Sequence, residues 1–156
     1  MNQFWKTGDA LIANIHRYQR YKARAGGWPR LLGKLAALRH FVLSVITASD
    51  ISPYARLGVG LKLPHPNGIV IHDDAVIGAD CMIMQQVTIG QLAAKGAPVI
   101  GAHVYIGAGA RVLGRVVVGD RARIGANAVV LADVPADSTA VGIPARISAK
   151  DSAAGV

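Results

Sequence analysis

The segment LKLPHPNGIVIHDD, residues 61–74, contains two of the five histidines of the chain, His65 and His72. An imidazole can accept a proton near neutral pH, so a histidine in a loop could act as a general base on a substrate hydroxyl. His65 sits where prolines and glycine interrupt a regular apolar pattern, which favours a loop. A solvated loop histidine without a chemical role fits the same residues, so the local sequence leaves both interpretations open.

The remaining metal-binding and nucleophilic side chains are few. Cys81 is the only cysteine, so the chain can form no internal disulfide and no cysteine cluster for a metal. No His-x4-His pair is present, which argues against a three-histidine zinc site. We expect Cys81 in the core, His72 and His103 facing solvent, and His16 and His40 in helices without an evident partner. No metal is expected.

Length and composition predict one folded domain. The chain has 156 residues, of which 52% are hydrophobic and 17% charged, so general disorder is excluded. No apolar run approaches the roughly 18 residues that a membrane span requires, and the N-terminus lacks the pattern of a secretory signal. These features favour a cytoplasmic protein.

The net charge of +8 is concentrated at one end. Residues 1–48 contain eight basic residues and a single acidic one, Asp9. This part reads as two helices, and its positive charge is either a solvated face or a surface that is attracted to an anionic membrane. Nucleic acid is a poor partner because stacking aromatics do not accompany the basic residues.

An internal repeat predicts the architecture. An aliphatic residue recurs at every sixth position of the C-terminal half, and a small or medium apolar residue follows it four positions later. The aliphatic positions are Ile100, Ile106, Val112, Val118, Ile124 and Val130. A period of six suits a coil with three flat sides and about 18 residues per turn. We therefore expect a mainly β protein, a parallel β-helix of hexapeptide repeats.

Two breaks in the repeat predict loops. The aliphatic step from Leu63 to Ile71 is eight residues, and the step from Ile89 to Ile100 is eleven. A stacked solenoid can place extra residues only outside its coils. The segments PHPNG and QLAAKGAP should therefore project from the prism, and loops on a rigid scaffold often carry function.

The motifs SDI, HPNGIVI, YIGAGARVLG and VGIPARI occur in this order, and together they resemble the serine acetyltransferase group of hexapeptide-repeat acyltransferases. The likeness covers about residues 45–147. It implies a left-handed parallel β-helix, residues 49–147, after a short α-helical segment, residues 1–48, with a C-terminal tail, residues 148–156. It also implies an O-acetyltransferase that uses acetyl-CoA as co-substrate.

The resemblance implies roles for particular residues. The histidine of the H-x-x-G-I-V loop, here His65, would be the general base, and Asp50, fifteen residues earlier, would orient it. The active sites would lie between the subunits of a homotrimer, with the pantetheine arm of CoA against small residues and its phosphates against basic ones. The small residues are Gly107, Ala108, Gly109, Gly125 and Ala126, and the basic residues are Arg146 and Lys150.

The acceptor is where the sequence departs from enzymes that acetylate free serine. Pro64 precedes His65 where those enzymes have aspartate, and Gly96 and Ala97 stand where they have an Arg-His pair; Lys95 is a weak substitute for that arginine. A serine carboxylate or ammonium would therefore lack partners.

We expect the acceptor to be a sugar hydroxyl of an exopolysaccharide or lipid-linked precursor, at the inner face of the membrane. The alternative is serine O-acetyltransfer in cysteine biosynthesis, and a third possibility is a non-catalytic scaffold. Because the helical segment is short, a lone trimer is favoured over a hexamer.

Overall fold

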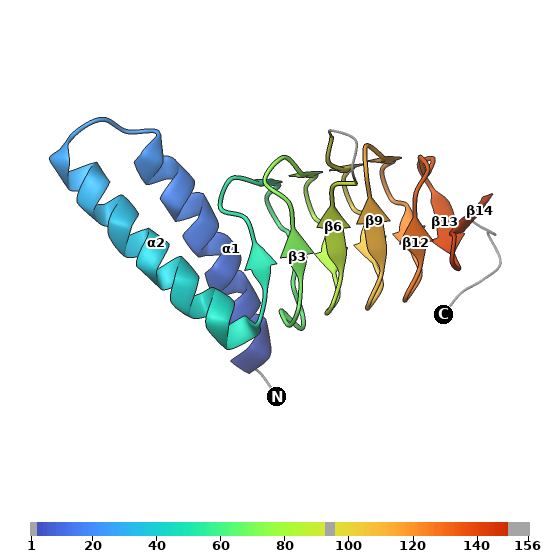
Figure 1. The fold of residues 1–156 in the computed structure, drawn as a ribbon, viewed down its shortest axis with the longest axis horizontal. Coiled ribbons are helices and arrows are strands. Elements are labelled where there is room, and N and C mark those ends of the chain that lie inside the picture. Colours follow the sequence, from blue (N-terminus) through green and yellow to red (C-terminus); the bar gives the residue numbers. More distant parts are fainter. Residues whose placement is uncertain (1–2, 93–95, 150–156) are drawn as a thin grey trace.

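The computed structural model describes residues 3–92 and 96–149, which form a helical hairpin followed by a three-sided prism of β-coils (Figure 1). The hairpin consists of α1 (Gln3–Lys22) and α2 (Gly27–Thr47). Leu11 and Ile15, four residues apart on α1, are fully buried. Ala48 ends α2 in a left-handed backbone conformation, with φ 48°.

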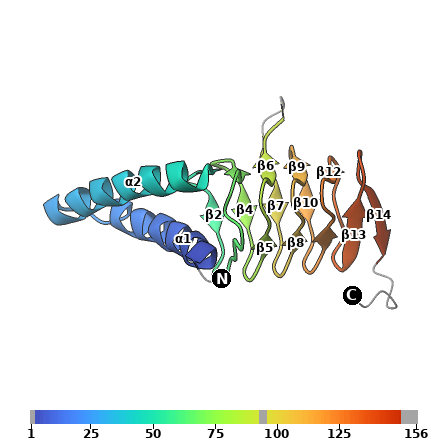
Figure 2. The same ribbon diagram turned by 90° about the horizontal axis from the view of Figure 1, so that it is seen from below.

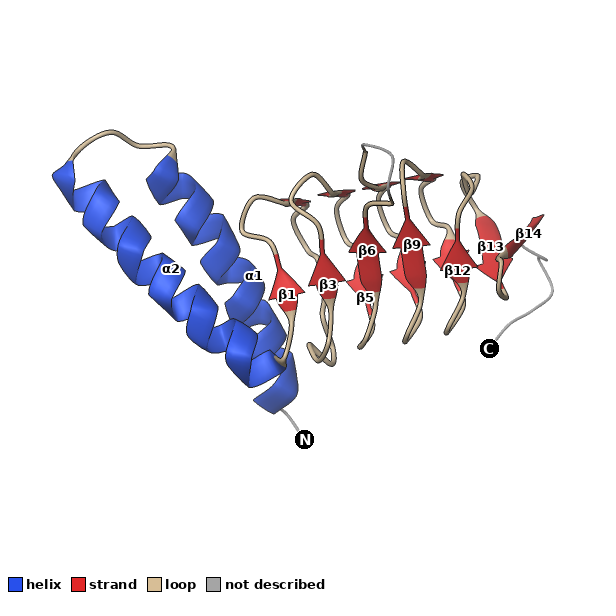
Figure 3. Cartoon of the chain, viewed as in Figure 1, coloured by secondary structure: helices blue, strands red, loops and turns tan. Residues whose placement is uncertain are grey.

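The strands of the prism are short because each one forms only a single side of a coil (Figure 3). They are β1 (Asp50–Ile51), β2 (Arg56–Leu57), β3 (Val70–Ile71), β4 (Val76–Ile77), β5 (Met82–Ile83), β6 (Thr88–Gly90), β7 (Val99–Ile100), β8 (Tyr105–Ile106), β9 (Arg111–Leu113), β10 (Val117–Val118), β11 (Arg123–Ile124), β12 (Val129–Val130), β13 (Ser138–Val141) and β14 (Arg146–Ala149).

Three sheets make the sides of the prism. The first has the order β1-β3-β6-β9-β12, the second β2-β4-β7-β10, and the third β5-β8-β11-β13-β14. All pairs are parallel except β13 with β14, which is antiparallel. In each turn of the coil the chain runs along the first sheet, then the second and then the third (Figures 1 and 2). This path is left-handed, as expected from the resemblance.

The inward side chains match the predicted repeat. In the first sheet Ile71 lies over Ile89, Ile89 over Val112 and Val112 over Val130, so like residues stack on like. Every aliphatic residue of the predicted six-residue repeat in residues 100–130 is at most 1% exposed, and the small residues four positions later are also buried. Burial of each large aliphatic side chain contributes about 1.5–3 kcal/mol, so this column is the main stabilising feature.

Other sequence predictions about single residues also have clear outcomes. Cys81 is buried at its core position, with Sγ 3.1 Å from the carbonyl of Gly101, and burial raises the pKa of its thiol. His103 is exposed and His72 is partly exposed. The expectation that His16 lacks a partner is wrong, because its Nε2 donates to the carbonyl of Leu57 at 2.9 Å.

Both breaks in the repeat fall in loops. Residues 64–69 precede β3, and residues 91–98 join β6 to β7, of which 93–95 lie outside the described residues. Within the described residues, no helix has the length and apolar character needed to cross a membrane.

A charged residue in the aliphatic column should prevent folding. Val112 is fully buried between coils, so Val112→Asp should lower the free energy of unfolding by more than about 3 kcal/mol, as an unpaired carboxylate is buried. Circular dichroism and urea denaturation would measure the effect. Val117→Asp, at an outward position that is 50% exposed, is the matched control and should change stability by less than about 1 kcal/mol. A folded, stable Val112→Asp variant would contradict the assigned inward face.

Candidate active site

One edge of the prism carries the predicted base, and we call it the histidine edge. It is the corner between the third and first sheets, formed by residues 47–49, 65–68, 85–86, 108–109 and 126–127. Backbone hydrogen bonds join its successive coils: Gly68 N to Thr47 O at 3.3 Å, Gln86 N to Asn67 O at 2.8 Å, Gly109 N to Gln85 O at 2.9 Å and Asn127 N to Ala108 O at 2.8 Å.

The turns of the histidine edge share one backbone geometry. Gly68, Gln86, Gly109 and Asn127 all have positive φ, between 56° and 70°. Glycine and asparagine adopt this conformation at little cost, whereas other residues rarely do. The edge is therefore a row of near-identical tight turns. This repetition explains why His65 and the small residues of later coils lie along the same edge of the prism.

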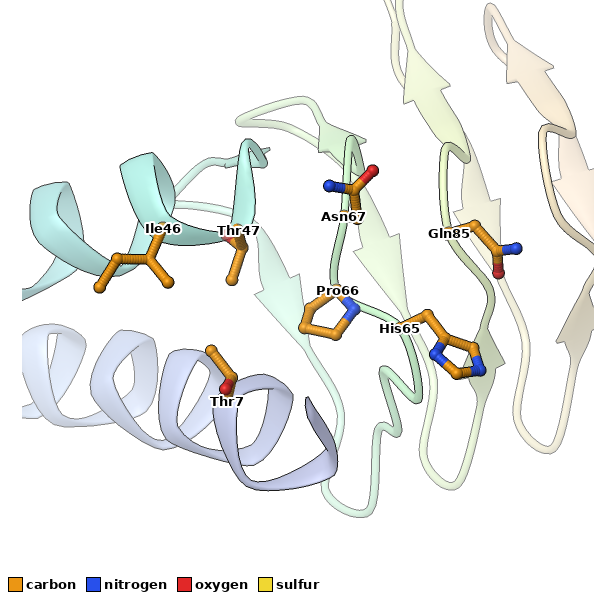
Figure 4. A pocket seen from close by; sticks show the side chains of 7 residues that line it. All are labelled: Thr7, Ile46, Thr47, His65, Pro66, Asn67 and Gln85. Atoms are coloured by element: carbon orange, nitrogen blue, oxygen red, sulfur yellow. The ribbon is translucent and has the colours of Figure 1, made fainter. Parts of the chain in front are cut away.

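A cavity of about 370 Å³ opens at the start of this edge (Figure 4). It lies where α1, the end of α2 and the loop before β3 meet. Its lining residues are Thr7, Ile46, Thr47, His65, Pro66, Asn67 and Gln85. His65 is the only ionisable side chain among them, and the other polar groups are neutral hydroxyls and amides. The prediction placed His65 in a loop, and the structure places it in a pocket as well.

Ser49 fixes the loop that carries His65. Its buried hydroxyl donates to the carbonyl of Pro66 at 3.2 Å and accepts a hydrogen bond from the amide of Ile69, also at 3.2 Å. These contacts hold both ends of the turn that follows His65. Sequence reasoning did not single out this serine, although it is the first residue of the SDI motif.

The structure does not bring Asp50 to His65. The backbone of Asp50 pairs with Val70 on the next coil, and within the described structure neither a hydrogen bond nor an ion pair joins the side chains of Asp50 and His65. Asp50 is exposed on the outer face of the first sheet, whereas His65 lies at the corner. The negative charge of Asp50 acts on His40 instead. Burial lowers the pKa of His40, and the carbonyl of Ile51 and the charge of Asp50 partly offset this effect.

The predicted cofactor residues fall into two groups. Ala108, Gly109 and Ala126 lie on the histidine edge, one and two coils beyond Gln85. Gly107 and Gly125 are glycines for a packing reason, since a Cβ would lie 2.6 Å from Ala126 N and 2.7 Å from Val141 Cγ1 respectively. Their contact with CoA stays a prediction.

Of the two predicted phosphate-binding residues, the structure describes only Arg146. Arg146 is exposed on β14, at the C-terminal end of the third sheet. Lys150 lies outside the described residues.

Gln85 is a pocket residue that sequence reasoning missed. Its backbone carbonyl binds Gly109, while its side-chain Oε1 is buried and has no hydrogen-bond partner in the described structure. Figure 4 shows its amide beside the imidazole of His65 at the pocket wall. A buried acceptor without a partner is costly, and among the described residues that line the pocket the Oε1 of Gln85 is the one such atom.

The described positions at which the resemblance implies acceptor-binding groups are apolar in the structure. Pro64 and Ala97 are buried, and Gly96 adopts a φ of 128° that suits glycine. Lys95, the residue considered as a substitute for the arginine, lies outside the described residues. No charged group of the described chain therefore replaces the missing aspartate and the Arg-His pair in the pocket lining.

Comparison with known proteins identifies the family. The profile described as Bacterial transferase hexapeptide (six repeats) matches residues 97–132. The chain is 41% identical over 142 residues to a serine acetyltransferase of Synechococcus elongatus and 38% identical over 155 residues to one of Haemophilus influenzae. These matches cover 89% and 97% of this chain.

A solved structure is also similar. The crystal structure of Neisseria gonorrhoeae serine acetyltransferase in complex with serine superposes with a TM-score of 0.77 at 36% identity, and the match covers 92% of this chain and 57% of that one. The chain belongs to the serine acetyltransferase-like group of hexapeptide-repeat proteins.

This serine acetyltransferase-like chain spans about half the length of the curated relatives that it matches, 55% and 58% for the two named above. Its similarity to them covers the hairpin as well as the prism, since the Haemophilus influenzae match extends over 97% of the chain. The fold and family predicted from the motifs are thus confirmed.

Loss of the Ser49 hydroxyl should weaken the loop of His65. Ser49→Ala leaves the Ile69 amide and the Pro66 carbonyl without their partner, so the free energy of unfolding should fall by about 1–3 kcal/mol. Urea denaturation would measure it. Ser148→Ala, at an exposed serine on β14, is the control and should stay within about 0.5 kcal/mol of the parent. Equal stability of the two variants would show that Ser49 does not hold the turn.

Proposed function

We propose that the protein is an acetyl-CoA-dependent O-acetyltransferase with His65 as general base. The observation that carries this proposal is the place of His65 in a pocket at the head of the histidine edge, in line with Ala108, Gly109 and Ala126. The imidazole would take the proton of an acceptor hydroxyl, whose oxygen attacks the thioester carbonyl. The carbon–sulfur bond then breaks, and the leaving thiolate takes the proton from the imidazolium.

The edge supplies a path for the cofactor. We propose that the pantetheine arm follows it from Gly109 and Ala126 towards His65, because small side chains let an extended chain approach the backbone. Polar groups of the arm would then meet peptide groups at the turns. We propose that CoA also contacts Gly107, Gly125 and the basic residues Arg146 and Lys150. We further propose that the protein is a homotrimer with active sites between subunits and that it is cytoplasmic.

Free serine is the acceptor that the comparisons favour. The curated relatives are named serine acetyltransferases, and one of the similar crystal structures is a complex with serine. The sequence-based preference for a sugar of an exopolysaccharide or lipid-linked precursor is not supported by them, and the alternative fits better. Serine O-acetyltransfer is therefore the first activity to test.

The pocket itself supports a second candidate, an uncharged hydroxyl compound such as a sugar. Thr7, Thr47, Asn67 and Gln85 are neutral hydrogen-bonding groups, and among the described residues that line the pocket no carboxylate or guanidinium is present. Free serine is a zwitterion, and its charged groups need charged or well-matched polar partners when they leave water. A sugar hydroxyl requires only the neutral groups present.

Removal of the imidazole should abolish most of the activity. His65→Ala should lower turnover by a factor of about 100 or more while the fold is retained, because general-base catalysis contributes about 10²–10⁴ in rate. Thiol release from acetyl-CoA, first with serine and then with a panel of sugars, measures it. His103→Ala, at an exposed histidine on a later coil, is the matched control and should keep the parental rate.

Each outcome of this assay separates the candidates. Efficient turnover with serine favours the first acceptor, and turnover with sugars alone favours the second. A near-normal rate for His65→Ala would refute the base. No turnover with any acceptor, together with no CoA binding, would favour the non-catalytic scaffold.

The variant Asp50→Asn tests the predicted orienting role of Asp50. A large fall in turnover at unchanged stability would require Asp50 to reach His65 in the working enzyme.

A further inference from the structure

Gln85 carries a side-chain oxygen that the chain itself leaves unsatisfied. Within the described residues, three buried side-chain nitrogen or oxygen atoms have no hydrogen-bond partner: Asn14 Oδ1, His40 Nδ1 and Gln85 Oε1. Of these, only the Gln85 oxygen belongs to a residue that lines the cavity of His65. Because a buried acceptor without a donor costs free energy, its position beside the proposed base requires an explanation.

The backbone around Gln85 is held by the coils on both sides. Its carbonyl accepts a hydrogen bond from Gly109 N, on the next coil, at 2.9 Å. The amide of the following residue, Gln86, donates to Asn67 O, on the preceding coil, at 2.8 Å. The main chain therefore cannot move the Gln85 side chain out to solvent without breaking contacts between coils.

The polar neighbours in the cavity wall do not supply a donor to this oxygen. Thr47 Oγ1 donates to Leu43 O at 2.8 Å, within α2. Figure 4 shows the amide oxygen of Gln85 on the side that faces His65, with the amide nitrogen turned away. No hydrogen bond to that oxygen is found among the described residues, the imidazole included. The chain thus leaves the Gln85 oxygen to a donor from outside.

The cavity limits which group of a bound molecule can be that donor. Its volume is about 370 Å³, and the imidazole and the amide lie side by side at its wall (Figure 4). A substrate whose reacting hydroxyl meets the imidazole of His65 therefore presents its neighbouring atoms to Gln85. An amide oxygen accepts a hydrogen bond from a hydroxyl or an ammonium group, but not from an ether, a carbonyl or a carboxylate.

We propose that Gln85 determines acceptor specificity by accepting a hydrogen bond from a donor group on the carbon next to the one that carries the reacting hydroxyl. This inference rests on the proposed function, because it takes His65 as the base that meets the reacting hydroxyl. Two acceptor classes share the required chemistry: a β-hydroxy amine such as serine has an ammonium group there, and a vicinal diol of a sugar has a second hydroxyl. An acceptor without that donor leaves the Gln85 oxygen buried and unpaired, so the site rejects it.

A cycle of substrate pairs and enzyme variants measures this contact. Thiol release from acetyl-CoA is followed with L-serine against 3-hydroxypropionate, which lacks the amine, and with a methyl glucoside against its monodeoxy derivatives. The parent chain should favour the member that carries the donor by at least about tenfold in kcat/KM. Gln85→Met, similar in length but without an amide oxygen, should reduce this preference to about twofold or less. Gln85→Glu keeps an acceptor oxygen and should retain the preference, and the pair that responds identifies the donor as ammonium or hydroxyl.

Stability measurements separate a substrate contact from a structural one. Gln85→Met removes an unpaired buried acceptor, so its unfolding temperature should be at least that of the parent, and its KM for acetyl-CoA should be unchanged. A lower unfolding temperature with an unchanged acceptor preference would overturn the proposal, since a donor of the assembled protein would then satisfy the oxygen.

The outcomes also separate this inference from the proposed base. An unchanged preference in Gln85→Met, with His65→Ala inactive, would overturn the role of Gln85 and leave the base in place. If the parent chain turns over none of the acceptors, calorimetric titration with L-serine and with the glucoside takes the place of the rate. Tighter binding by the parent than by Gln85→Met would then support the proposal. Equal binding by the two, or none by either, would overturn it.

Discussion

The stacking of coils in a fixed register is the constraint on which the rest of this structure depends. Ile71, Ile89, Val112 and Val130 lie one above another inside the prism, and backbone hydrogen bonds join each coil to the next. A shift by one residue would turn the aliphatic side chains outward. Because the register is fixed, residues far apart in sequence come to one edge, and His65, Gln85, Gly109 and Asn127 become neighbours in a row.

The regular part of the fold could be predicted because its signal is repeated. One buried aliphatic residue every six positions identifies the prism without any long-range information, and the two departures from that spacing identify the loops. The candidate site could be predicted only in part. His65 is recognisable from its motif, but the hydrogen bonds of the Ser49 hydroxyl and the unpartnered side-chain oxygen of Gln85 leave no periodic trace in the sequence. Whether Asp50 meets His65 depends on side-chain direction at a corner, which residue spacing does not determine.

The chemistry of the pocket and the family relationship point to different acceptors for one reaction. The curated relatives are named serine acetyltransferases. Pro64 and Ala97, however, are buried apolar residues at positions where the resemblance implies charged groups, and apart from His65 the described lining of the pocket is neutral.

The most direct measurement of the central claim is a crystal structure of the chain with CoA bound. The account predicts that the pantetheine arm follows the histidine edge past Gly109 and Ala126, with its sulfur within reach of the imidazole of His65. CoA bound along another edge of the prism, or with its sulfur remote from His65, would contradict it.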